Sequence, residues 1–120
     1  MAEQQSPNYE DLFYQSEDGL TLYARDYPAP SPDAQCVLLM HGLSRNSRDF
    51  EVLADHLSTR YRVLVAEQRG RGKSEWDTDP TRYAIPHYVR DMFALLQAAN
   101  VSRVATVGTS MGGLMAMVMN

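Results

Sequence analysis

The sequence predicts an α/β fold in which a mostly parallel sheet is covered by helices. Three apolar runs, at 36–40, 61–66 and 103–107, have the unbroken hydrophobicity of strands that are buried on both faces. Segments with apolar residues at helical spacing lie between these runs. A hairpin pattern precedes all of them. Strands that alternate with helices in this way belong to the α/β class.

The chain begins with a polar tail, residues 1–10, which is followed by a hairpin over 12–27. Asp18 and Gly19 mark the turn between the two arms. In the second arm, apolar residues alternate with polar or aromatic ones, which is typical of a half-buried strand. The proline-rich segment 28–33 then forms a loop, because proline cannot donate to a strand ladder.

Two helices are expected between the apolar runs. The first is predicted from Asn46 or Ser47 onward, because either side chain can cap the free N–H groups of a helix N-terminus. The second begins near Ile85 and Pro86, since proline is well tolerated in a first helical turn, and it ends at Asn100. Their apolar positions are Phe50, Leu53, Ala54 and Leu57 in the first helix and Ile85, Val89, Met92, Leu96 and Ala99 in the second.

Composition and charge exclude several classes of protein. The 120 residues include 11 basic and 15 acidic ones, a net charge of −4 that does not favour nucleic acid as a partner. The single cysteine, Cys36, cannot form an internal disulfide. No apolar run approaches the roughly 20 residues that cross a bilayer, and the N-terminus lacks the features of a signal peptide. We therefore expect a cytoplasmic protein without a membrane span, a metal or a cofactor.

The first glycine-rich segment, G-R-G-K-S at 70–74, ends like a phosphate-binding P-loop. A P-loop also needs a glycine five places before its Gly-Lys pair, and Glu67 stands there. It needs a helix that starts at the lysine, whereas the residues at 76–80 favour a loop. We therefore interpret the segment as a structural loop and not as a nucleotide site.

The second glycine-rich segment, G-T-S-M-G at 108–112, has the spacing of a serine on a tight turn between a strand and a helix. An apolar strand precedes it, and a sequence free of helix breakers follows it. Gly108 and Gly112 fit such a turn, because a β-carbon at either position would collide with nearby backbone. Ser110 would then lie at a helix N-terminus, where free N–H groups favour negative charge.

Three motifs together make the chain resemble the N-terminal half of an α/β-hydrolase. H-G-L-S at 41–44 resembles the oxyanion loop of that family, and R-G-R-G-K-S at 69–74 resembles its R-G-x-G-x-S loop. G-T-S-M-G-G at 108–113 resembles its nucleophile elbow. The resemblance implies that residues 11–120 form one incomplete domain. Many members have an aspartate where this chain has Glu67, a difference that we take as tolerated.

The resemblance also implies roles for individual residues. Ser110 would be the nucleophile that attacks an acyl carbonyl, and the backbone N–H groups of Leu43 and Met111 would form the oxyanion hole. A serine nucleophile disfavours epoxide hydrolases and dehalogenases, which use aspartate. Esterase, lactonase, thioesterase, peptidase, carbon–carbon hydrolase and acyltransferase activities remain open. The residues that would support the motifs are His41, Gly42, Gly108 and Gly112.

No complete catalytic triad can be assembled from these residues. The family order places the acid and the histidine after the serine, and ten residues follow Ser110. His41 would shape the oxyanion loop, and His56 and His87 are predicted to be surface residues. Neither Asp91 nor Glu67 has a histidine in the expected place. Cys36 is expected to be a buried structural thiol, and the methionines near the C-terminus are expected to pack in the core. These are Met111, Met115, Met117 and Met119.

Two hypotheses for the function follow. In the first, the chain is part of a longer serine hydrolase that acts on a small-molecule acyl substrate through an acyl-enzyme, and the isolated chain has negligible turnover. In the second, it is a non-catalytic half-domain that acts as an interaction module, and a partner completes its sheet. The strand at 103–107 would offer an open edge for self-association or for such a partner. The two hypotheses differ in whether a downstream segment supplies strands, an acid and a histidine.

Overall fold

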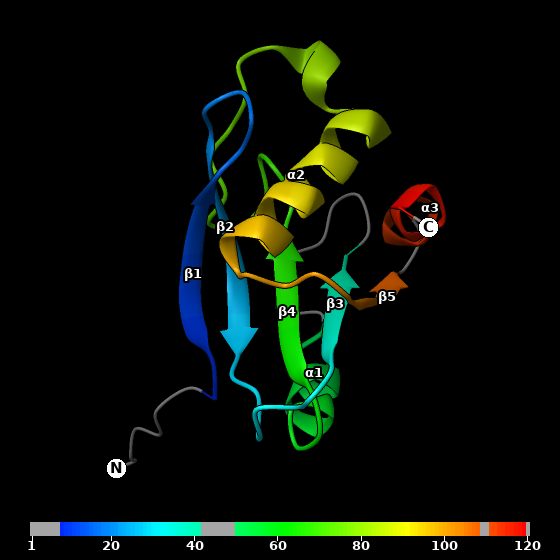
Figure 1. Ribbon diagram of the computed structural model, residues 1–120. Coiled ribbons are helices and arrows are strands. Elements are labelled where there is room, and N and C mark those ends of the chain that lie inside the picture. Colours follow the sequence, from blue (N-terminus) through cyan, green and yellow to red (C-terminus); the bar gives the residue numbers. More distant parts are fainter. Residues whose placement is uncertain (1–7, 42–49, 109–110, 120) are drawn as a thin grey trace.

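The computed structural model describes residues 8–41, 50–108 and 111–119, which form one five-stranded sheet with helices on both faces (Figure 1). This arrangement confirms the α/β class. The strands are β1 (Glu10–Gln15), β2 (Thr21–Tyr27), β3 (Cys36–Met40), β4 (Arg62–Glu67) and β5 (Ala105–Gly108). The helices are α1 (Glu51–Leu57), α2 (Ile85–Ala98) and α3 (Met111–Met119), with a short 3₁₀ turn, η2 (Pro80–Arg82), before α2.

The strand order in the sheet is β1-β2-β4-β3-β5. β1 and β2 form the predicted antiparallel hairpin, and Gly19 in its turn has a φ of 93°, a conformation that favours glycine. β2 is antiparallel to β4, whereas β3 is parallel to both β4 and β5. The carboxyl ends of β3, β4 and β5 therefore lie at one edge of the sheet, the upper edge in Figure 1.

Hydrophobic clusters lie on both faces of the sheet. Leu38 of β3 belongs to the cluster that α2 and α3 cover, whereas its neighbour Leu39 belongs to the cluster that α1 covers. Both leucines are fully buried, as predicted for a strand that is covered on both faces. None of the described helices is long and apolar enough to cross a membrane.

Two strands differ from the prediction in their burial. β2 was expected to be half-buried, yet Tyr23, Ala24 and Arg25 are all buried. The reason is that both faces of β2 are covered. Ala24 belongs to the cluster under α2 and α3. On the other face the ring of Phe13 lies 5.1 Å from that of Tyr23, and the guanidinium of Arg25 lies 4.3 Å from the ring centroid of Tyr9. β5 was expected to be fully buried, but Val107 is 40% exposed because β5 pairs only with β3 among the described strands.

The helices agree better with the sequence pattern. α2 has Pro86 in its first turn, and Asn100, which follows it, has the positive φ of 59° that often ends a helix. α1 begins at Glu51 with Phe50 at its N-cap and no side-chain cap, and positions 46–49 lie outside the described residues. Leu53 was predicted to face the core but is 40% exposed.

Candidate active site

The three sequence motifs converge on the carboxyl edge of the sheet. His41 directly follows β3, Glu67 is the last residue of β4, and Gly108 is the last residue of β5. Because these strands are parallel, all three residues lie at the same edge. In open α/β sheets this edge is where ligands bind.

The connection between β5 and α3 is short and tightly packed. β5 ends at Gly108 and α3 begins at Met111, so two residues join the strand to the helix. A β-carbon added at Gly108 would lie 2.2 Å from the carbonyl carbon of Gly112. One added at Gly112 would lie 2.2 Å from the carbonyl oxygen of Met40 in β3. Both glycines are therefore needed for α3 to pack against the ends of β5 and β3.

The residues proposed to react are neighbours in the chain of β3 and α3. Ser110, Gly42 and Leu43 lie outside the described residues. Ser110 directly precedes Met111, the first residue of α3, whose backbone N–H belongs to the helix turn that lacks intrahelical acceptors. Gly42 directly follows His41. The described residues therefore include the chain on both sides of positions 109–110 and the residue that directly precedes the proposed oxyanion loop.

The imidazole of His41 joins the ends of β3 and β4. The side chain is fully buried, and its Nε2 atom accepts a hydrogen bond from the backbone N–H of Gln68 at 3.0 Å. An accepting Nε2 in a neutral imidazole requires the proton to lie on Nδ1. The nitrogen that would have to take a proton from a serine is therefore already bonded, which agrees with a shaping role.

The loop after β4 is closed by its own hydrogen bonds. The backbone N–H of Lys73 donates to Glu67 Oε1 at 2.8 Å, and the hydroxyl of Ser74 donates to the backbone oxygen of Glu67 at 2.5 Å. Gly70 and Gly72 have positive φ values of 79° and 55°. No helix begins at Lys73 in this described segment. These features agree with a structural loop and leave the Lys73 N–H unavailable to a phosphate.

A buried ionic cluster beside the loop was missed by the sequence analysis. The guanidinium of Arg69, 1% exposed, donates to Asp91 at 2.7 and 2.6 Å and to Asp77 at 2.9 Å. It also donates twice to Asp18, at 3.0 Å in each case. The hydrogen bonds from Arg69 hold the pKa of Asp18 well below its ordinary value, whereas burial raises the pKa of Asp91. The sequence signal that could have indicated this cluster was Asp91, an acidic residue among the apolar positions of α2.

The other residues considered from the sequence are Cys36, His56 and His87, and none of them is part of the proposed site. Burial raises the pKa of the Cys36 thiol to about 11, so this residue stays protonated at neutral pH, as expected of a structural thiol. His56 is exposed, as predicted. His87 was also predicted to be a surface residue but is half-buried, and its Nδ1 is buried without a hydrogen-bond partner among the described residues. The cause is that α2 holds it against the Arg69 cluster, where both line a small cavity.

The methionines near the C-terminus are only partly core residues. Met115 is fully buried, and Met119 packs against the same cluster. Met117 is 74% exposed, which contradicts the prediction for this residue, because it lies on the face of α3 that no described element covers. The side chain of Met111 lies outside the described residues.

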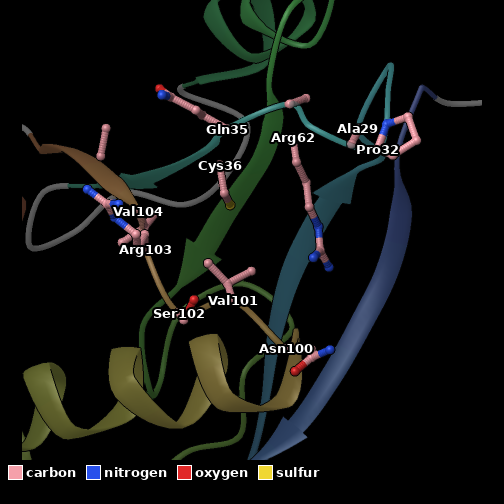
Figure 2. Close-up of a pocket in the computed structure, with 12 residues that line it drawn as sticks. Ala29, Pro32, Gln35, Cys36, Arg62, Asn100, Val101, Ser102, Arg103 and Val104 are labelled. Carbon is pink, nitrogen blue, oxygen red and sulfur yellow. The ribbon is translucent and has the colours of Figure 1, made fainter.

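One cavity lies away from the carboxyl edge of the sheet. It has a volume of about 610 Å³ and is lined by the start of β3 and β4 and by the link from α2 to β5 (Figure 2). Cys36, Arg62 and residues 100–105 contribute to its wall, and none of the proposed catalytic residues does. Among the described residues, no group of three or more His, Cys, Asp or Glu side chains is placed to hold a metal ion.

Comparisons with known proteins agree with this architecture. Residues 35–119 match the family described as alpha/beta hydrolase fold. A 3-hydroxybutyrate-oligomer hydrolase from Cupriavidus necator is 48% identical over 77 residues, which is 64% of this chain and 26% of that protein. A crystal structure of an alpha/beta hydrolase from Novosphingobium aromaticivorans superposes with a TM-score of 0.91 and 42% identity, over 96% of this chain and 40% of that one.

An esterase from Exiguobacterium antarcticum is also similar in structure. It has a TM-score of 0.82 and 28% identity, over 92% of this chain and 39% of that chain. The chain thus spans 26% of the curated relative and 39–40% of the two solved structures.

Proposed function

The chain belongs to the α/β-hydrolase family, and from that premise we propose that it carries the nucleophile and oxyanion hole of a serine hydrolase. Its substrate would contain an ester or a related acyl bond. The observation that carries the proposal is the two-residue connection between the end of β5 at Gly108 and the start of α3 at Met111. A β-carbon at Gly108, or at Gly112 in the first turn of α3, would collide with backbone. In a nucleophile elbow, a turn of this kind carries the serine directly before the helix, which in this proposal is Ser110.

In the proposed reaction, Ser110 Oγ attacks the acyl carbonyl while a histidine takes the hydroxyl proton. The charge that develops on the carbonyl oxygen is stabilised by the backbone N–H groups of Met111 and Leu43. The histidine then gives the proton to the leaving group, and an acyl-enzyme remains on Ser110. Water attacks the acyl-enzyme by the same route in reverse, which releases the acid and restores the serine.

The triad histidine and acid are proposed to come from outside these 120 residues. The hydrogen bond that His41 Nε2 accepts from the Gln68 N–H supports this proposal, because that nitrogen is already occupied. His56 belongs to α1, which covers the opposite face of the sheet from α3. The complete relatives are much longer than this chain, which covers 40% of one solved hydrolase. We propose that the triad histidine and acid lie in a segment that corresponds to this additional length.

The substrate class is inferred from the names of the relatives. One is a 3-hydroxybutyrate-oligomer hydrolase and another is an esterase. When hydroxy acids are joined through their own hydroxyl and carboxyl groups, the bonds between them are esters. We therefore propose a carboxylic ester as the bond that the complete protein cleaves, with the acyl-enzyme on Ser110.

Ester hydrolysis by the complete protein tests this proposal, with Ser110→Ala as the variant. Loss of the nucleophile of a triad costs on the order of 10⁴-fold or more in kcat. Cys36→Ser is a suitable control because Cys36 is buried in β3 and lies outside the proposed machinery. Serine-dependent turnover supports the proposal, and activity that survives in Ser110→Ala contradicts it.

A second candidate function is supported by the exposed apolar surface beside β5. Val107 is 40% exposed, and Leu114 and Met117 of α3 are 56% and 74% exposed. This surface suits a protein segment that extends the sheet, as an interaction module would require. Intact-mass measurement of the natural gene product separates the candidates. A mass well above 13.5 kDa favours the hydrolase, and a mass of 13.5 kDa favours the partner-completed module.

A further inference from the structure

The Arg69 cluster joins three separate parts of the fold. Its carboxylates are Asp18 in the hairpin turn, Asp77 in the loop before η2 and Asp91 in α2. Arg69 forms five hydrogen bonds to these groups, and a guanidinium has five N–H donors. Hydrogen bonds between ionised groups in a buried position are strong and specify geometry. The cluster therefore fixes the backbone at Arg69 relative to α2 and the hairpin.

Gln68, the residue directly before Arg69, connects the backbone at Arg69 to the side chain of His41. Its backbone N–H donates to His41 Nε2 at 3.0 Å. The Gln68 side chain does little to fix its own residue, although it is fully buried. Its Nε2 makes a 3.5 Å contact with Met92 Sδ, and its Oε1 has no hydrogen-bond partner among the described residues. The Gln68 backbone is held on one side by Glu67, which pairs with Tyr23 of β2, and its carbonyl accepts from the Arg71 N–H at 3.0 Å. On the other side it is held by its covalent neighbour Arg69, whose side chain is anchored in the buried cluster.

We propose that Arg69 is a positioning residue for the oxyanion loop and acts through Gln68 and the imidazole of His41. His41 directly precedes Gly42 and Leu43 in the sequence, and Leu43 carries one proposed oxyanion donor. This inference rests on the proposed function for its effect on catalysis. The physical link from Arg69 to His41 consists of the peptide bond to Gln68 and the hydrogen bond from the Gln68 N–H to His41 Nε2, and it does not depend on the proposed function.

A second ion pair in the same sheet provides a control. Arg62 donates to both carboxylate oxygens of Asp26 at 3.1 and 2.8 Å, with the same two-bond geometry as Arg69 and Asp91. It lies at the start of β4, whereas Arg69 lies just beyond its end. Asp26→Asn therefore weakens a pair of the same geometry at the opposite ends of the strands. That pair is more exposed, with side chains 25% and 17% accessible against 1% and 2% for Arg69 and Asp91. Activities are therefore compared only where both variants are fully folded, and there a purely stabilising role for Arg69 predicts similar kcat values.

The experiment compares Asp91→Asn with Asp26→Asn in the complete protein, under conditions where urea titration shows both to be folded. We expect kcat of Asp91→Asn to fall roughly 10- to 100-fold with little change in KM, because a misplaced oxyanion donor weakens transition-state binding. Asp26→Asn should keep kcat within about twofold of wild type. Asp18→Asn is a milder second variant, since the Asp18 side chain is 30% exposed and the substitution is compatible with folding.

Nitrogen-15 NMR of His41 gives a readout that is independent of activity. The wild-type imidazole should be neutral with its proton on Nδ1, and Asp91→Asn and Asp18→Asn should shift the Nε2 resonance while Asp26→Asn leaves it unchanged. An unshifted resonance in both cluster variants overturns the link, as does a kcat that falls no more in Asp91→Asn than in Asp26→Asn. If Ser110→Ala remains active, the proposed function fails. The His41 Nε2 resonance alone then decides whether Arg69 positions His41.

Discussion

Alanine at Gly112 should destabilise the protein strongly, whereas alanine at the adjacent Gly113 should not. A β-carbon at Gly112 would lie 2.2 Å from the Met40 carbonyl oxygen, more than 1 Å inside the separation of about 3.5 Å that non-bonded atoms prefer. The obstacle is backbone of a buried strand, so α3 has to move by about 1 Å. We expect a loss of about 3 kcal/mol in the free energy of unfolding, the upper part of the range for overpacked sites.

The matched substitution at Gly113 meets ordinary contacts. Its nearest neighbour would be the Gly108 carbonyl oxygen at 3.5 Å. Alanine also favours helix over glycine by up to about 1 kcal/mol, so Gly113→Ala should be neutral or stabilising. Urea denaturation of the complete protein measures both variants, with the slope of the transition as a check on two-state behaviour. Equal unfolding midpoints for the two variants would refute the packing argument for the elbow.

Three further predictions concern the core, the Arg69 cluster and the isolated chain. Met115→Ala should lower the free energy of unfolding by about 2–4 kcal/mol, because the side chain is fully buried. Met117→Ala should change it by about 0.5 kcal/mol at most, because that side chain is 74% exposed. Calorimetry measures both variants. The hydrogen bonds from Arg69 hold the pKa of Asp18 below its ordinary value in an unfolded chain, which is about 4. The stability that Asp18 contributes is therefore present above about pH 4 and is lost as pH falls through the lowered pKa of the folded state. Asp18→Asn should therefore make the urea midpoint less sensitive to pH between about 4 and 2, and an unchanged slope would contradict this. The isolated 120-residue chain should show no Ser110-dependent multiple turnover in an ester-hydrolysis assay, and such turnover would show that no outside histidine is needed.

The sequence predicted what depends on local patterns. The apolar run at 36–40 and the helical spacing from Ile85 onward correspond to β3 and α2, because burial period and capping are encoded in neighbouring residues. Gly108 and Gly112 were predicted to avoid a collision, and the structure has backbone close to both positions. These features need no knowledge of the strand order.

What the sequence did not predict depends on contacts between distant segments. β2 is buried on both faces because side chains from other segments cover it, such as Tyr9 against Arg25, and a period-2 pattern does not contain these contacts. The Arg69 cluster joins residues 51, 8 and 22 positions away, at Asp18, Asp77 and Asp91. Each of these charges alone is typical of a solvated surface. Only the fold brings them together and buries them.

The central claim is that Ser110 is an activated nucleophile, and covalent labelling tests it most directly. A fluorophosphonate reacts with an activated serine hydroxyl by forming an oxygen–phosphorus bond and releasing fluoride. The complete natural protein would be treated with this probe, digested and mapped by mass spectrometry. We predict one phosphonate per chain, on the peptide that contains Ser110. An actively hydrolysing protein that carries the label elsewhere, or remains unlabelled, would contradict the claim.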